Sequence, residues 1–125
     1  NKETSDVAMS FFKKAKIDHK INLLIDNAIV SLENLYNQKK KFDLIFIDAD
    51  KENYINYFNN AFNTLDNNGI IVVDNVLWYG DVVDQNKKNR LTLKIREFNK
   101  FIKNDNRVES LILPIGDGLS VCRKI

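Results

Sequence analysis

The feature that most constrains the fold is a pair of short, nearly unbroken apolar runs joined by one amphipathic stretch. The first run is Phe42–Ile47 and the second covers residues 69–73, and both are rich in branched side chains. Strands buried on both faces of a parallel sheet have this composition. Between the runs, apolar residues keep a helical spacing from residue 51 to about 65, and Asn67-Asn68-Gly69 is the expected stop. The spacing predicts a strand, a crossover helix and a parallel strand.

The flanking segments continue this alternation. Periodic apolar residues predict helices near residues 4–15, 29–36 and 91–102, and an apolar run predicts a further strand at 21–25. Two last strands, at 108–113 and 119–121, are joined by a link too short for a parallel crossover, so they should form an antiparallel hairpin. The order predicts one α/β domain over residues 1–125, with a mostly parallel sheet and a C-terminal antiparallel hairpin.

Composition narrows the functional classes. The formal net charge is +2 and the lysines are scattered, whereas nucleic-acid binders concentrate basic charge on one face. A single cysteine, Cys122, excludes an internal disulfide and a cysteine-based zinc site. No apolar stretch approaches the roughly 18 residues that span a bilayer. We therefore expect a cytoplasmic protein without membrane or nucleic-acid partners.

Acidic residues stand at the ends of both apolar runs. Asp48 follows the first run, and Asp74 and then Asn75 follow the second. If the intervening helix is a right-handed crossover, the two strands are neighbours about 4.8 Å apart and both aspartates lie at the carboxyl edge of the sheet, where ligands bind in open α/β folds. Two carboxylates there repel each other unless a cation or a proton lies between them. An all-oxygen set favours Mg²⁺, with Mn²⁺ or Ca²⁺ as alternatives, over zinc.

Simpler interpretations of the same residues stay open. Asp48 and Asp50 could cap the next helix, and Asp74-Asn75 could begin a turn. Lys51 falls in the first turn of the predicted helix, where the dipole disfavours a cation; with a metal nearby, the same field would lower its pKa and suit it for proton abstraction. The alternative is an exposed lysine.

Three segments together resemble one enzyme family. They are residues 42–54 (FDLIFIDADKENY), 74–80 (DNVLWYG) and 113–119 (LPIGDGL), and their order and spacing are similar to those of the caffeoyl-CoA and catechol-type O-methyltransferases and their bacterial relatives. The resemblance covers essentially the whole chain. It implies a Rossmann-like class I methyltransferase fold and divalent-metal-dependent transfer of a methyl group from S-adenosylmethionine to a hydroxyl of a small catechol-like or hydroxycinnamoyl thioester acceptor.

The resemblance also implies roles for individual residues. Asp48, Asp74 and Asn75 would hold the metal. The catalytic residues would be Lys51, as the general base, and Asp48. Asp48 and Asp50, with the Asn27-Ala28 turn, match positions bordering the methyl donor. Trp78 and Tyr79 would wall the acceptor pocket, with packing against the hairpin as the alternative, and Tyr79 departs from the smaller polar residue of the plant members. The Gly116-Asp117-Gly118 segment is interpreted as a turn.

The family's glycine-rich donor loop has no counterpart among the glycines, which are at positions 69, 80, 116 and 118. We therefore expect a C-terminal portion of the fold, whose sheet is incomplete beside Phe42–Ile47 and has an unpaired apolar edge there. We expect this chain alone to bind the donor weakly and to be inactive. The exposed edge should also make it associate, for example as a homodimer. Two alternatives remain: a tRNA hydroxyuridine O-methyltransferase, which the weak basic charge disfavours, and a non-catalytic remnant or subunit-association module.

Overall fold

The computed structural model describes residues 2–125, and its elements alternate much as the sequence predicts. The helices are α1 (Lys2–Lys14), α2 (Ala28–Asn37), α3 (Tyr54–Thr64) and α4 (Arg90–Lys103). The strands are β1 (Phe42–Ile47), β2 (Leu65–Val73), β3 (Val108–Leu113) and β4 (Leu119–Lys124). Short 3₁₀ turns occupy η1 (Asp18–Lys20), η2 (Lys51–Asn53) and η3 (Trp78–Gly80).

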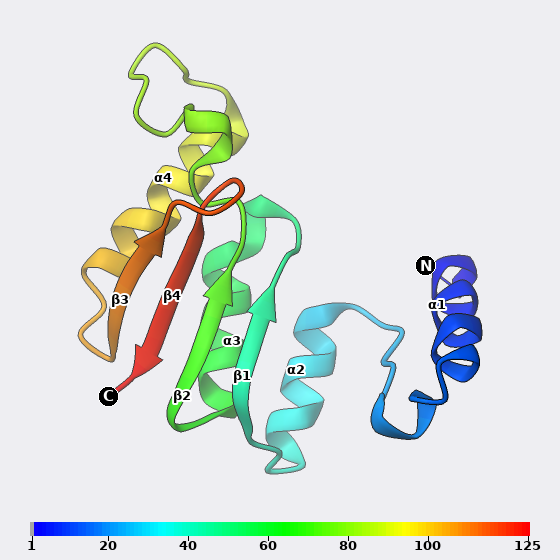
Figure 1. Cartoon of the computed structure of the whole chain (residues 1–125). Helices are drawn as coiled ribbons and strands as arrows, with labels where there is room; N and C mark the ends of the chain where they lie inside the picture. Colours follow the sequence, from blue (N-terminus) through cyan, green and yellow to red (C-terminus); the bar gives the residue numbers. More distant parts are fainter. Residues whose placement is uncertain (1) are drawn as a thin grey trace.

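The strands form one mixed sheet in the order β1-β2-β4-β3 (Figure 1). β1 and β2 are parallel and joined by α3, as predicted, while β4 is antiparallel to both β2 and β3. The sheet of residues 2–125 is therefore less parallel than expected, because one expected strand is missing: residues 21–25 form no strand. An extended segment becomes a strand only where a neighbour satisfies its backbone groups.

The boundary between α3 and β2 differs from the prediction. The helix already ends at Thr64, and Asn67-Asn68-Gly69 lie within the strand instead of stopping the helix. Leu65 explains the early start, since its side chain is fully buried and pairs with Phe42 across a register shift in the β1–β2 ladder. Burial of a leucine outweighs the turn preference of the asparagines that follow.

The core lies between one face of the sheet and the helices α3 and α4. Its centre is aromatic: Phe58 and Phe98 are fully buried, and their rings meet edge to face with centroids 6.2 Å apart. Tyr54 packs on Phe98 in the same way, at 5.3 Å. Such pairs add roughly 0.5–1.5 kcal/mol to the burial itself, so this cluster fixes the start of α3 against α4.

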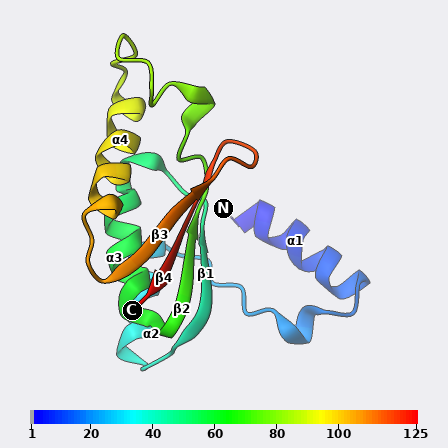
Figure 2. The ribbon, with the colours of Figure 1, turned by 60° about the vertical axis from the view of Figure 1, so that its left-hand side comes forward.

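The other face of the sheet is open in the described residues. Figure 2 shows α2, α3 and α4 on one side and α1 standing apart on the other, and no side chain of α1 is buried. Leu44 and Phe46, on the open side of β1, are 59% and 55% exposed. The expectation that β1 is buried on both faces is wrong for these residues, whereas the expected unpaired apolar edge is confirmed, because β1 is a terminal strand of the sheet.

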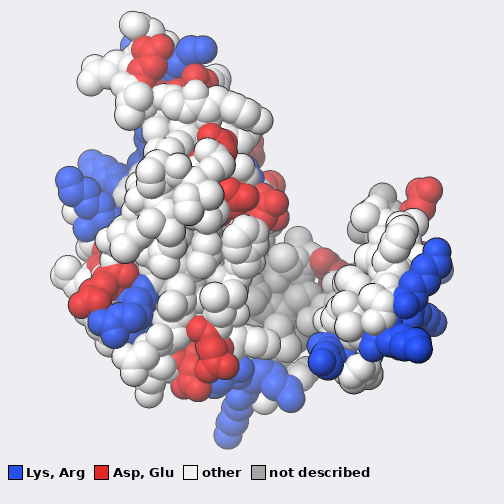
Figure 3. All heavy atoms as spheres, viewed as in Figure 1, with Lys and Arg blue, Asp and Glu red and all other residues white. Residues whose placement is uncertain are grey.

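No helix within residues 2–125 has both the length and the apolar character needed to cross a bilayer. On the face seen in Figure 3, lysine and arginine side chains form separate groups, with one group along α1, and no continuous basic surface joins them.

Candidate functional site

The carboxyl edge of β1 and β2 brings together the acidic residues that the sequence singles out. Ile47 pairs with Val73 in the parallel ladder, and the Asp74 amide donates to the Ile47 carbonyl at 3.0 Å. Asp48 and Asp74 therefore leave the sheet from adjacent strands at the same end. The predicted adjacency of the two strand ends is confirmed.

Lys51 joins the two strand ends. Its ammonium donates to Asn75 Oδ1 at 2.7 Å and to Asp48 Oδ1 at 3.2 Å. The lysine side chain is 12% exposed and that of Asp48 is 57% exposed. Lys51 is thus a largely buried cation that links the end of β1 to the end of β2, and the alternative of an outward-pointing lysine is wrong.

The pKa of Lys51 is raised in this arrangement. Burial of the ammonium lowers its pKa, but interactions with Tyr54 and with the Asp48 carboxylate together outweigh that effect. The sequence analysis expected a helix dipole and a nearby metal to lower the pKa of Lys51. The protein groups around Lys51 raise its pKa instead. One reason is local: Lys51 lies in the short η2 turn before α3 and not in the helix proper.

Tyr54 is a residue of the candidate site to which the sequence analysis assigned no role. Its hydroxyl donates to the Asp74 carbonyl at 2.8 Å, and its ring centroid lies 5.1 Å from the Lys51 ammonium. Burial raises the pKa of the Tyr54 hydroxyl although Lys51 opposes the shift. The signal was the spacing, since a residue three positions after Lys51 shares its face of a helical turn.

Asp74 and Asn75 form a strained corner. Asn75 has φ 58°, in the left-handed region, and its amide donates to Asp74 Oδ1 at 2.6 Å. A non-glycine residue held there costs on the order of 1 kcal/mol or more, and asparagine tolerates it better than most. The corner turns the Asn75 side chain toward Lys51, as their hydrogen bond shows.

The donor chemistry of this corner fits a hard divalent cation. Asp48, Asp74 and Asn75 offer only carboxylate and amide oxygens, the ligands that Mg²⁺ and Ca²⁺ prefer. Within residues 2–125 no group of three or more His, Cys, Asp or Glu could hold a metal, so a cation here would depend on the Asn75 amide as its third protein ligand. The Lys51 ammonium occupies part of that place, as a cation between Asp48 and Asn75.

Trp78 and Tyr79 follow the corner in a left-handed turn. Their φ values are 49° and 55°, and their ring centroids are 5.5 Å apart. Tyr79 is 83% exposed, while Trp78 is half-buried. The Tyr79 amide donates to Asp117 Oδ1 at 2.5 Å, and the Leu77 amide donates to the Asp117 carbonyl at 2.9 Å. The Gly116-Asp117-Gly118 turn interpretation is therefore right, but the sequence analysis missed that this turn holds the Trp78–Tyr79 segment.

A cavity of about 330 Å³ lies on the other side of Asp48, between α2 and β1. Ala28 and Asp48, two of the predicted donor-site residues, line it, together with Asp26 and Tyr57. Asp26 was not singled out, yet it follows the apolar run at 21–25 as Asp48 follows β1. This volume is at the lower end of the usual 300–1,000 Å³ of small-molecule sites.

The remaining two donor-site residues do not line that cavity. Asn27 caps α2 through a hydrogen bond from the Ile29 amide to its Oδ1, at 2.9 Å. Asp50 makes no side-chain cap of the following turn, so the capping interpretation is wrong for it. Instead the Tyr57 hydroxyl donates to Asp50 Oδ1 at 2.5 Å, which lowers the pKa of the Asp50 carboxyl and raises that of Tyr57 to about 12. Asp50 thus acts on the cavity through Tyr57.

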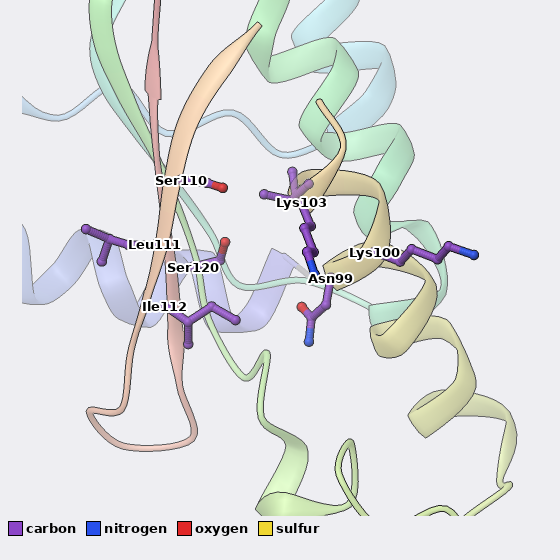
Figure 4. Close-up of a pocket in the computed structure, with 8 residues that line it drawn as sticks. Asn99, Lys100, Lys103, Ser110, Leu111, Ile112 and Ser120 are labelled. Carbon is purple, nitrogen blue, oxygen red and sulfur yellow. The ribbon is translucent and has the colours of Figure 1, made fainter. Parts of the chain in front are cut away.

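A larger hollow, of about 590 Å³, lies between α4 and the β3–β4 hairpin (Figure 4). Figure 4 shows the side chains of Asn99 and Ser120 in the space between helix and strands. Its polar lining consists of Asn99, Lys100, Lys103, Ser110 and Ser120, without an acidic residue or a histidine. We therefore assign the chemistry to the carboxyl edge of β1 and β2 and not to this hollow.

The sequence matches the family model described as O-methyltransferase over residues 1–125. It is 38% identical to the tapetum-specific methyltransferase 1 of Arabidopsis thaliana, over 96% of this chain and 54% of the relative. It is 36% identical to the caffeoyl-CoA O-methyltransferase of Medicago sativa, over 100% of this chain and 54% of the relative. The chain thus spans about half the length of these curated relatives.

Solved structures agree with the fold. The O-methyltransferase from Bacillus cereus in complex with SAH superposes with a TM-score of 0.88 at 29% identity, over 100% of this chain and 60% of that one. The SAH-bound Podospora anserina methyltransferase PaMTH1 gives a TM-score of 0.83 at 25% identity, over 100% and 58%. The expected Rossmann-like class I methyltransferase fold is confirmed, and the chain belongs to the O-methyltransferase family.

Proposed function

We propose that this chain carries the metal and acceptor half of an S-adenosylmethionine-dependent O-methyltransferase, acting on a hydroxyl of a small catechol-like or hydroxycinnamoyl thioester acceptor. The observation that carries the proposal is the position of the Lys51 ammonium, within hydrogen-bond distance of both Asp48 and Asn75. A basic group, an acid and an amide oxygen thus meet at the sheet edge where α/β folds bind ligands. Family membership and the SAH-bound neighbours support the same chemistry.

In the proposed reaction an acceptor oxygen attacks the methyl carbon of the sulfonium, the carbon–sulfur bond breaks with its electron pair going to sulfur, and the hydroxyl proton leaves to a base. A divalent cation bound by Asp48, Asp74 and Asn75 would favour the ionised hydroxyl and orient it. Lys51 lies beside two of these three residues and is the proposed proton acceptor. Because its pKa is raised, the ammonium must first release a proton to solvent, and a divalent cation at the same corner would favour that release. Tyr54 holds the Asp74 carbonyl and so keeps the corner in place.

The cavity beside Asp48 is the proposed place for part of the methyl donor. Ala28 and Ala49 contribute small side chains to its lining, and Asp26 and Asp48 supply carboxylates. We propose that the cavity binds the donor weakly in these residues alone, because its volume is small and its β1 side is open to solvent. Calorimetric titration with S-adenosylmethionine tests this, and micromolar affinity of the 125-residue chain would contradict it.

We further propose a cytoplasmic homodimer. The exposed side chains of Leu44 and Phe46 on β1 and of Phe11 on α1 support association, because exposed apolar side chains favour contact with a second copy. Light scattering over a concentration series tests the assembly.

The experiment on the metal site compares three aspartates. Asp48→Asn and Asp74→Asn remove one charge each from the proposed ligand set, whereas Asp43→Asn removes an exposed charge at the opposite end of β1. We expect Mn²⁺ affinity, measured by titration, to fall at least about tenfold in the first two variants and to stay unchanged in the control. Methyl transfer to a catechol, assayed in a longer protein that contains this chain and has the length of the curated relatives, should fall in parallel. Unchanged Mn²⁺ affinity in both variants refutes the metal site, and a longer protein that binds the metal but is inactive would leave the non-catalytic association module as the better account.

A further inference from the structure

The turn after the candidate metal corner has an unusual backbone. Among the described residues, Trp78 and Tyr79 are the only two neighbouring non-glycine residues with positive φ, and Gly80 continues the run at φ 82°. Bulky aromatic residues rarely adopt this conformation, and when they do the surroundings impose it. The turn closes on itself through Gly80 N to Leu77 O and Asp81 N to Trp78 O, at 3.0 and 2.9 Å.

The loop between β3 and β4 holds the turn in this conformation. Asp117 binds the turn twice, by its carbonyl to the Leu77 amide and by Oδ1 to the Tyr79 amide. A carboxylate on a backbone amide is a strong hydrogen bond. The other carboxylate oxygen, Oδ2, is buried and has no hydrogen-bond partner, and such an oxygen destabilises the fold. Oδ2 of Asp117 thus lowers the stability of the fold, while Oδ1 fixes a strained turn. We interpret Asp117 as a residue that positions the turn and not as one that stabilises the fold.

The position matters because the turn forms one wall of a hollow. A space of about 560 Å³ lies between the turn and the β3–β4 loop, with largely apolar lining: Leu77, Tyr79, Gly80, Val82, Val83, Gly116 and Asp117. An aromatic acceptor fits such a lining. If Tyr79 loses its hydrogen bond to Asp117, this wall moves and the hollow changes shape.

The metal corner should not move with it. Val76, which separates Asn75 from the turn, is held by two contacts that do not involve the Asp117 side chain. Its amide donates to the Gly118 carbonyl at 3.1 Å, and its carbonyl accepts from Asn99 Nδ2 at 2.8 Å. The loss of that side chain should therefore act on the acceptor end of the site and leave the end at Asp48 and Asn75 intact.

We propose that Asp117 is a positioning residue that holds the Trp78–Tyr79 turn in its left-handed form and thereby sets how the acceptor binds. The role in acceptor binding rests on the proposed function, while the role in holding the turn does not. Two readouts separate these parts. Trp78 is the only tryptophan of the sequence, so its fluorescence reports on the turn whatever the protein catalyses.

The experiment uses Asp117→Ala and Asp117→Asn, with Asp66→Ala as the matched control. Asp66 also accepts a backbone amide on Oδ1, from Asn67, but at the opposite end of β2. Acrylamide quenching of Trp78 should rise about twofold or more in Asp117→Ala, and should stay at the wild-type value in Asp66→Ala and near it in Asp117→Asn, which keeps an Oδ1 acceptor. Unchanged quenching in a folded Asp117→Ala protein overturns the proposal.

The second readout is acceptor binding, by direct titration of this chain with a catechol and by KM in a longer protein that contains the chain and has the length of the curated relatives. Asp117→Ala should weaken it about tenfold with little change in kcat and none in Mn²⁺ affinity, as expected for the loss of one charge-assisted contact. A fall in kcat at constant KM, or no catechol binding by the wild-type protein, overturns the acceptor part. If Asp117→Ala does not fold, Asp117→Glu decides, because it keeps the charge and displaces the oxygen: wild-type quenching and KM in that variant would refute the proposal.

Discussion

Gly118 is the residue whose replacement tests the packing between the two loops most directly. Its φ is +84°, and a Cβ added to it would lie 2.9 Å from Leu77 Cδ1, with further Leu77 side-chain atoms at similar or closer range. Gly116, in the same loop, also has a positive φ, +58°, but an added Cβ would meet nothing within 4 Å. The two glycines therefore share the backbone requirement and differ in the contact.

The expected magnitudes follow from this difference. An alanine in the left-handed region costs roughly 1 kcal/mol, which is the whole expected loss of unfolding free energy for Gly116→Ala. Gly118→Ala adds an overpacking cost of about 1–3 kcal/mol, because Leu77 has to move, and its total is about 2–4 kcal/mol. Leu77 precedes Trp78, so Gly118→Ala should also shift the fluorescence of that tryptophan in the folded state.

Urea unfolding followed by circular dichroism measures both variants. With an m-value of about 2 kcal/mol/M, the middle of the usual range for small domains, the midpoint for Gly118→Ala should lie about 1–2 M below wild type, and that for Gly116→Ala about 0.5 M below. Equal losses in the two variants would refute the reasoning, since the contact with Leu77 would then carry no weight.

Other expectations concern regions around the site. The Arg96 guanidinium donates to the carbonyls of Val82, Lys87, Asp81 and Asp84 at 2.5–2.9 Å; Arg96→Lys cannot reproduce this fork, so amide hydrogen exchange should accelerate across residues 81–88 and not in α3. Hydrogen bonds from Arg107 lower the pKa of Asp105, whose side chain is 6% exposed. This stabilisation is present above the carboxyl's ordinary pKa and is lost as the pH falls through its lowered value, so Asp105→Asn should flatten the acid limb of stability against pH; an unchanged limb would contradict the assignment. Burial raises the pKa of the Cys122 thiol, and a thiol reagent should label it only at the rate of unfolding.

The sequence could predict the parts of this fold that depend on local pattern and on short connections. Phe42–Ile47 and the hairpin at the C-terminus lie where the apolar runs and the five-residue link required them. The sequence also predicted that Asp48 and Asp74 are adjacent, because a right-handed crossover places the two parallel strands side by side with their carboxyl ends at the same edge of the sheet. Pattern and topology together were enough to bring two of the site residues to one edge.

What the sequence could not predict depends on partners that are distant along the chain. Residues 21–25 have a strand-like pattern, but without a hydrogen-bonded neighbour among the described residues the pattern does not produce a strand. The contact between Tyr79 and Asp117 spans 38 positions and involves a backbone amide, which no side-chain pattern encodes. Lys51 was expected to have a lowered pKa, but interactions with Tyr54 and Asp48 raise it, and their geometry depends on the η2 turn.

These contacts connect the two ends of the candidate site to different parts of the fold. At one end, Lys51 is bonded to Asp48 and Asn75, and Tyr54 connects the Asp74 carbonyl to the aromatic core. At the other end, the Trp78–Tyr79 turn is held by the β3–β4 loop. Val76, buried and bonded on both its amide and its carbonyl, lies between them. Loss of the Asp117 side chain is therefore expected to change the turn without moving the groups proposed to bind the cation, because neither hydrogen bond of Val76 involves that side chain.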